Sequence, residues 1–198
     1  MSLLVATQNP GKMREFRALL APLGVPLLFP PDLGLEITVE EHGTTYAENA
    51  ALKARAYAQA SGRLTLADDS GLEVDALDGA PGLRSARYTV GSDGDRVAAL
   101  LARLEGVPPE QRTARFRCVV AIVTPQGDLF TAEGVCPGVI ATQRAGSGGF
   151  GYDPVFYLPE FGVTMAQLPP EVKNRVSHRA RAVHAALPLL RQLLHPET

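Results

Sequence analysis

The stretch "LTLADDSGLEVDAL", residues 64–77, joins an apolar run directly to two adjacent carboxylates. Its first part, residues 64–67, predicts a buried strand because three of its four residues are apolar. Asp68 and Asp69 come next, and Ser70 with a glycine follows them. This polar group predicts a tight turn into a second strand that ends near residue 77. Two neighbouring carboxylates repel each other, so the stretch calls for positive charge close by.

A bound divalent cation is one source of that charge. Mg²⁺ takes one or two protein carboxylates and leaves its other positions to water and phosphate oxygens. Glu40 and Glu41 lie in a loop over 29–44 that is rich in Pro and Gly, and they could supply a further ligand. The alternative is structural, because Asp68 and Asp69 could form an Asx turn with the residues that follow. The residues alone leave both interpretations open.

A second feature is the strand, loop and helix predicted over residues 3–24. Asn9 is a good N-cap and Pro10 suits the first helical position. The start of a helix presents free backbone N–H groups to an anion, whereas a cation gains nothing from the helix dipole there. Lys12 in the first turn therefore indicates either a bound anion or an ordinary solvated lysine. The segment is not a Walker P-loop, because the full glycine pattern is missing.

Two stretches in the second half of the chain are suited to a nucleobase. Phe150 lies in a glycine-rich loop over 146–151, so it either anchors the loop or stacks on a base. Lys173, His178 and Arg179 gather positive charge near the start of the last predicted helix. Cations at that end of a helix are unfavourable unless an anion or an acceptor-rich ligand lies among them, although a solvated basic helix start is the alternative. The four features together suggest one ligand that combines phosphate, metal and base.

Composition narrows the class of protein. With 198 residues, 45% of them hydrophobic, the chain can bury a sizeable core in one domain, 1–198. A net charge of -2 gives no general attraction to nucleic acid. Cys118 and Cys136 lie in apolar, strand-like surroundings and are expected to be buried thiols in a reducing compartment. We find neither a signal peptide nor an apolar run near the roughly 18 residues of a membrane span, so a cytoplasmic protein is expected.

The remaining patterns predict further helices and one strand hairpin. Thr45 with Glu48 forms a possible capping box, and a helix is expected from there to about residue 60. Pro188 is expected to kink the last helix. Another helix is predicted over 93–104, and strands over 113–124 and 128–140 are joined by a Pro-Gln-Gly turn. This mixture predicts an α/β fold with a mixed sheet.

Six motifs occur in order along nearly the whole chain. They are Thr7-x-Asn9-x-x-Lys12; Glu40-Glu41 ahead of Glu48-Asn49-Ala50 and Lys53-Ala54; Ala67-Asp68-Asp69-Ser70-Gly71-Leu72; Gly79-Ala80-Pro81-Gly82 with Ser85-Ala86-Arg87-Tyr88; Gly149-Phe150-Gly151-Tyr152-Asp153-Pro154; and Ser177-His178-Arg179. In these motifs the chain resembles the inosine/xanthosine triphosphate pyrophosphatases, which remove non-standard purine nucleotides. Gln8 departs from the family pattern, in which a small residue is frequent at that place.

The resemblance implies an elongated mixed sheet flanked by helices in two lobes, an active-site cleft between the lobes, and a homodimer. It implies Mg²⁺-dependent hydrolysis of ITP, dITP or XTP to the monophosphate and pyrophosphate. Asp69 would be the catalytic base and a metal ligand, with Glu40 favoured over Glu41 as the second ligand and Lys53 and Asp68 as helpers. The implied substrate-binding residues are Thr7, Gln8, Asn9, Pro10, Gly11, Lys12, Ser70, Phe150, Gly151, Tyr152, Asp153, Lys173, His178 and Arg179.

Two other functions fit parts of the sequence. One is a pyrophosphatase for modified pyrimidine nucleotides. Lys173, His178 and Arg179 argue against it, because they can offer donors to the 6-oxo group of a deaminated purine. The other is a regulator that binds nucleotides without cleaving them, in which the carboxylates of Glu40 and Asp69 would have no role.

Overall fold

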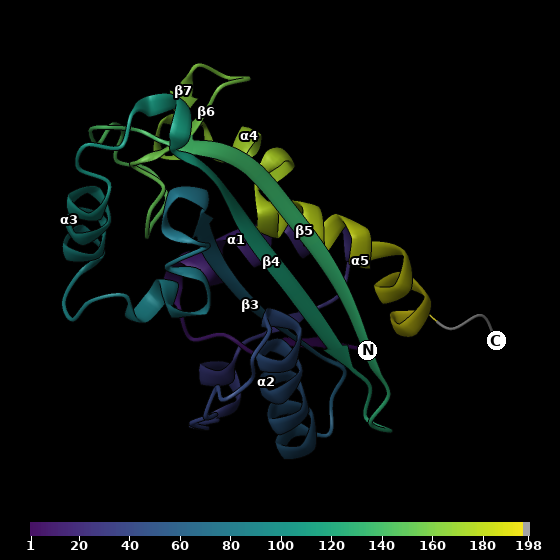
Figure 1. Ribbon diagram of the computed structural model, residues 1–198. Coiled ribbons are helices and arrows are strands. Elements are labelled where there is room, and N and C mark those ends of the chain that lie inside the picture. Colours follow the sequence, from purple (N-terminus) through teal and green to yellow (C-terminus); the bar gives the residue numbers. More distant parts are fainter. Residues whose placement is uncertain (196–198) are drawn as a thin grey trace. The chain divides into compact units, whose positions relative to one another are not determined.

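The computed structural model describes residues 1–195 and divides into two compact units (Figure 1). Three of the four boundaries between the units fall inside long strands, β3 (Thr65–Val74), β4 (Thr113–Val123) and β5 (Leu129–Ile140), and the fourth follows the first residue of helix α5 (His178–Leu194). The first unit comprises Met1–Asp69, Cys118–Gly134 and the described residues from Arg179 onward, and the second comprises Ser70–Arg117 and Val135–His178.

Seven strands of the described chain form one mixed sheet in the order β2-β1-β3-β4-β5-β6-β7. Strand β1 (Leu3–Val5) pairs in parallel with β2 (Leu27–Leu28) and with β3. Strand β6 (Phe156–Leu158) pairs in antiparallel fashion with β5 and with β7 (Val163–Thr164). Parallel pairing at the start of the chain follows from the helical crossover between β1 and β2. The predicted α/β fold with a mixed sheet is confirmed.

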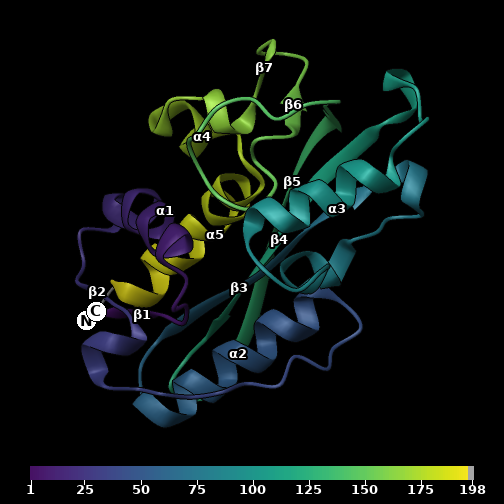
Figure 2. The ribbon, with the colours of Figure 1, turned by 90° about the vertical axis from the view of Figure 1, so that its left-hand side faces the viewer.

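Helices cover both faces of the sheet in the first unit. Figure 2 shows α1 (Pro10–Leu20) and α5 (His178–Leu194) on one face and α2 (Tyr46–Ser61) on the other. Successive side chains of a strand point to opposite faces, so β1 must be apolar on both sides to be buried between two layers. Leu3 and Val5 pack in the cluster that contains α1 and α5 residues, whereas Leu4 between them packs in the cluster that contains α2 residues.

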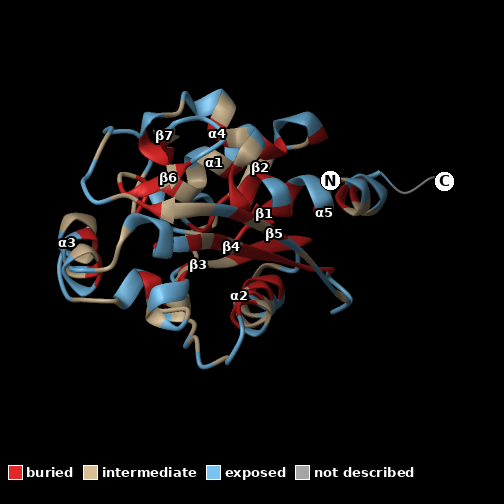
Figure 3. Cartoon of the chain, turned by 45° about the horizontal axis from the view of Figure 1, so that its top comes forward, coloured by how far each residue is buried: buried red, intermediate tan, exposed pale blue. Residues whose placement is uncertain are grey.

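The second unit has a core of its own. Leu72 and Val74 of β3 pack in one cluster with Val97 and Leu100 of α3 (Asp93–Arg103). All four side chains are buried, and Figure 3 shows buried residues in red on the strands of the sheet and on α3. The two cysteines are buried as expected, Cys118 in the cluster of α1 and α5 and Cys136 in the core of the second unit.

The tight turn predicted after residue 67 is wrong, because β3 runs without a break from Thr65 to Val74. Asp and Ser favour turns when their side chains bond to nearby backbone groups. The carboxylate of Asp68 instead bonds to Lys12 and Arg179, which come from distant parts of the chain. Tertiary partners thus remove the local reason for a turn.

Helix boundaries agree with the patterns in most places. Helix α1 begins at Pro10 as predicted, and α2 and α3 lie where helices were expected. Helix α5 continues through Pro188 to Leu194. The short helix α4 (Pro170–Val176), which ends just before it, was not predicted. Among the described residues, no helix has both the length and the apolar character needed to cross a bilayer.

Candidate active site

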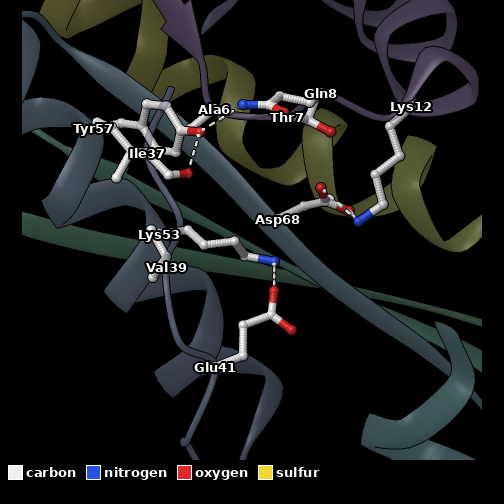
Figure 4. Close-up of a pocket in the computed structure, with 10 residues that line it drawn as sticks. All are labelled: Ala6, Thr7, Gln8, Lys12, Ile37, Val39, Glu41, Lys53, Tyr57 and Asp68. Carbon is white, nitrogen blue, oxygen red and sulfur yellow. Dashed lines mark hydrogen bonds and ion pairs between the residues drawn. The ribbon is translucent and has the colours of Figure 1, made fainter. Parts of the chain in front are cut away.

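A pocket of about 240 Å³ lies in the first unit. It brings residues of the predicted phosphate loop together with the carboxylate motif of β3, although the two are far apart in the sequence (Figure 4). Residues from the loop before α2 and from α2 itself complete the lining. The lining residues are Ala6, Thr7, Gln8, Lys12, Ile37, Val39, Glu41, Lys53, Tyr57 and Asp68.

The loop between β1 and α1 is shaped by its own side chains. Asn9 caps α1, since its Oδ1 atom accepts a hydrogen bond from the backbone N of Lys12 at 3.0 Å. The backbone N of Asn9 in turn donates to Thr7 Oγ1 at 3.3 Å. Pro10 and Gly11 form the first turn of the helix, and Gly11 is buried. The predicted cap is confirmed, and the cap leaves Thr7 and Lys12 beside the pocket.

Gln8 reaches across the pocket. Its Nε2 atom lies 3.4 Å from the hydroxyl of Tyr57, and that hydroxyl donates to the backbone oxygen of Ile37 at 3.2 Å (Figure 4). The side chain of Gln8 therefore links the loop after β1 to helix α2.

Asp68 is the centre of a buried ion network. It is 2% exposed, and the ammonium of Lys12 lies 3.0 Å from both of its oxygens. Arg179 donates to Asp68 Oδ2 from Nε at 3.2 Å and from Nη2 at 3.0 Å, while its Nη1 pairs with Glu15 at 2.5 Å. Burial opposes ionisation of Asp68, but Lys12 and Arg179 outweigh it and hold the pKa of this carboxyl well below its usual range.

Asp69 lies in a different environment. Lys53 is 3.8 Å from Asp69 Oδ1, and the side-chain amide of Asn49 donates to Asp69 Oδ2 at 3.2 Å. Burial raises the pKa of Asp69, and neither Lys53 nor Lys12 cancels that effect. Two adjacent aspartates therefore have pKa values displaced in opposite directions. Asp68 is a permanent anion, and Asp69 accepts a proton more readily, as a general base must.

The second acidic residue beside Asp69 is Glu41. Its carboxylate lies 2.7 Å from the ammonium of Lys53 and lines the pocket (Figure 4). Glu40, which the sequence favoured, is exposed and is absent from the lining. Successive side chains in an extended segment point in opposite directions, so only one of the two can face the pocket. Of the two, Glu41 therefore lines the pocket, and the metal ligand stays a prediction.

Asn49 belongs to one of the six motifs, but the sequence analysis assigned it no role in the site. It is 2% exposed in the first turn of α2, where its Oδ1 atom accepts from the backbone N of Gly43 at 2.8 Å. A side chain at Gly43 would place its Cβ 2.6 Å from that oxygen, so the close approach requires glycine. Asn49 therefore fixes both Asp69 and the segment that carries Glu41. A polar residue one turn into an apolar helix face was the available signal.

The glycine-rich loop lies in the second unit and is organised by Asp153. Asp153 Oδ2 accepts from the backbone N of Phe150 at 2.9 Å and from the ammonium of Lys173 at 2.6 Å. The ammonium of Lys173 also lies 5.0 Å from the centre of the Phe150 ring. Gly149 has a φ of +70°, and a Cβ there would collide with Asp153 Oδ2. The structure therefore brings Phe150, Asp153 and Lys173 together as predicted.

Other predicted substrate residues have structural partners. The hydroxyl of Tyr152 donates to the backbone oxygen of Ser85 at 2.8 Å. His178 is buried and stacks on Phe116 with ring centres 4.6 Å apart. Arg179 is 1% exposed and directs its guanidinium at Asp68 and Glu15, so its contact with a base stays a prediction. So does the phosphate contact of Ser70, which follows Asp69 in β3.

Comparison with known proteins assigns the chain to a family. The family model described as "Ham1 family" matches residues 3–189. The chain belongs to the Ham1 family. The predicted relationship to nucleoside triphosphate pyrophosphatases is confirmed by proteins of similar sequence. A dITP/XTP pyrophosphatase of Desulforamulus reducens is 50% identical over 200 residues and covers 100% of both chains. One of Geobacter sulfurreducens is 51% identical over 183 residues, covering 91% of this chain and 92% of that protein.

Solved structures of Ham1 proteins show the same fold. A HAM1 protein from Coxiella burnetii has a TM-score of 0.85 and 36% identity, and the match covers 100% of both chains. The dITP/XTP pyrophosphatase from Mycobacterium abscessus has a TM-score of 0.75 and 44% identity, covering 95% of this chain and 100% of that one.

Proposed function

We propose that this Ham1-family chain hydrolyses non-standard purine nucleoside triphosphates such as dITP and XTP to the monophosphate and pyrophosphate. Relatives at about half identity are named dITP/XTP pyrophosphatases, and the matches cover 100% and 91% of this chain. The observation that carries the proposal is the pocket in the first unit, which Lys12, Lys53 and Asp68 line, together with Asp69, whose carboxylate lies 3.8 Å from the ammonium of Lys53. Two cations suit the triphosphate, and the carboxylate with the raised pKa suits a base.

Residues in and beside the pocket have two roles, which are to bind the phosphates and to take a proton from water. Lys12 and the backbone N–H groups at the start of α1 bind phosphate oxygens. Asp68 fixes the position of Lys12 through their ion pair. Arg179 pairs with the same carboxylate and keeps it ionised and oriented. Asp69 takes a proton from the attacking water, and the amide of Asn49 orients its carboxylate. A regulator without catalysis would need no such base.

The carboxylates of Glu41, which lines the pocket, and of Asp69, on the other side of Lys53, fit a hard divalent cation. Among the described residues there is no cluster of three or more His, Cys, Asp or Glu side chains that could hold a metal. Glu41 and Asp69 are two carboxylates on either side of Lys53, and one or two carboxylates plus phosphate oxygens are what Mg²⁺ uses. Mg²⁺ bound there would neutralise charge that develops on the phosphates. We therefore assign Glu41 and Asp69 as its ligands.

Two neighbouring substitutions test the assignment of Glu41. Glu41→Gln should raise the Mg²⁺ concentration needed for half-maximal turnover by about tenfold or more, because it removes one of two charged ligands. Glu40→Gln is the matched control, with the same chemical change one residue away on an exposed side chain. Its Mg²⁺ requirement should stay within about twofold of the parent's. The assignment fails if Glu40→Gln has the larger effect, or if neither variant changes the Mg²⁺ requirement.

We assign the contacts for the base to Phe150 and Lys173. Phe150 stacks on the purine, and Lys173 beside its ring offers a donor near the base edge. Two further parts of the proposal are a homodimer, which sedimentation tests, and a cytoplasmic location, which two buried thiols support.

The direct test of the activity is product analysis after incubation with dITP and Mg²⁺. We expect dIMP and pyrophosphate in equal amounts; release of orthophosphate, or no turnover, would contradict the proposal.

A further inference from the structure

The start of helix α3 has two acidic residues with different partners. Asp95 belongs to the helix cap, since its Oδ2 atom accepts from both the backbone N and the hydroxyl of Ser92 at 2.7 Å. Asp93 takes no part in that cap. Its Oδ2 atom accepts a hydrogen bond from the backbone N of Gly151 at 2.7 Å, across 58 residues of sequence. Helix α3 is thereby joined to the glycine-rich loop.

Arg96 holds the carboxylate of Asp93 in place. Its Nη2 atom pairs with Asp93 Oδ1 at 2.5 Å, and its Nη1 atom donates to the backbone oxygen of Gly91 at 2.9 Å. Burial opposes ionisation of Asp93, but Arg96 and the N–H of Gly151 outweigh it and lower the pKa of this carboxyl. Asp93 is therefore an oriented anion at neutral pH, and it makes a charge-assisted hydrogen bond to the loop.

The loop needs such an anchor because its backbone is built on glycine. Gly149 and Gly151 flank Phe150 with φ values of +70° and +62°, a region that glycine enters and leaves freely. Two consecutive N–H groups fix the loop. That of Phe150 donates to Asp153, and that of Gly151 donates to Asp93. The orientation of the Phe150 ring thus depends on two carboxylates, those of Asp153 and Asp93.

We propose that Asp93 is a positioning residue for base recognition, which sets the orientation of the Phe150 ring by holding the backbone of Gly151. The inference rests on the proposed function, in which Phe150 stacks on the purine. Asp93 acts only on the base part of the substrate, so its loss should weaken binding of the nucleoside and spare binding of the phosphates.

The test compares Asp93→Ala with Asp95→Ala, two carboxylates of one helical turn. We expect Asp93→Ala to raise KM for dITP about tenfold and to change kcat by less than about threefold, as expected for a lost charge-assisted bond that acts on binding. The inhibition constant of deoxyinosine should rise by the same factor. That of inorganic tripolyphosphate, measured with excess Mg²⁺, should not change. Asp95→Ala should lower the melting temperature through its lost cap and leave KM within about twofold.

A conservative variant separates positioning from a general loss of structure. Asp93→Asn retains an oxygen that can accept from Gly151, so it should recover most of the parent's KM. The inference is overturned if Asp93→Ala and Asp95→Ala have the same KM, or if the inhibition constant of tripolyphosphate rises together with KM. Failure of the proposed function would look different, because the parent protein itself would not hydrolyse dITP.

Discussion

Asp69→Asn should lower the turnover of dITP by about 10²–10⁴-fold at saturating Mg²⁺, the usual contribution of a general base. The asparagine oxygen can still accept the hydrogen bond from Asn49, so the local structure should survive. What it lacks is the ability to take a proton from water. The measurement is kcat under saturating dITP and Mg²⁺.

The matched control for Asp69→Asn is Asp75→Asn, at the far end of the same polar stretch. Asp75 is 45% exposed and pairs with Arg115 at the surface. Its substitution should leave kcat within about twofold of the parent's. Turnover of Asp69→Asn within a few-fold of the parent's, with the control intact, would remove Asp69 from the catalytic step.

Asp68→Asn should cost about 3–5 kcal/mol in the free energy of unfolding at neutral pH, because it leaves buried positive charges without their anion. Lys12 and Arg179 both lie against Asp68, and Arg179 is 1% exposed. Urea unfolding of the two proteins measures the difference. Asp75→Asn again serves as the control, since exposed pairs such as Asp75–Arg115 contribute only ~0–1 kcal/mol. Equal losses in both variants would contradict a central role for the buried network.

The contribution of Asp68 should also depend on pH in a defined direction. Its pKa in the folded state lies below the ordinary value of 3.8. A lowered pKa gives stability that is fully present above 3.8 and is lost as pH falls below it toward the folded value. The difference between the parent and Asp68→Asn should therefore be constant from neutral pH down to about 5 and shrink as the pH falls further. A difference that grows in acid would have the wrong sign.

Local patterns predicted those parts of the fold that depend on local chemistry. The cap at Asn9 and the burial of β1 follow from residues next to one another. The predicted turn at 68–71 failed because the charges that stabilise an extended Asp68 come from α1 and α5. Tertiary partners of this kind cannot be found from a short window of sequence.

The sequence predicted which residues form the candidate site better than it predicted what each of them contacts. Lys12 pairs with Asp68 and Lys53 lies near Asp69, and the roles of these residues stay predictions. The choice between Glu40 and Glu41 depends on which way an extended backbone faces, and the sequence does not contain that information. The position of Arg179 depends on its ion pairs with Asp68 and Glu15, which no pattern indicated.

The most direct measurement of the central claim is kcat/KM for dITP and dATP with one preparation of the protein. The two substrates differ only at the 6/1 edge of the purine, where dITP carries an oxo acceptor and an N1–H donor and dATP an amino donor and an N1 acceptor. A site that hydrogen-bonds the oxo group leaves buried polar groups unpaired with dATP, and such sites discriminate by up to ~10⁴–10⁵. We predict that kcat/KM for dITP, and likewise for XTP, exceeds that for dATP by orders of magnitude, with pyrophosphate as the product. Comparable values for dITP and dATP would contradict the account.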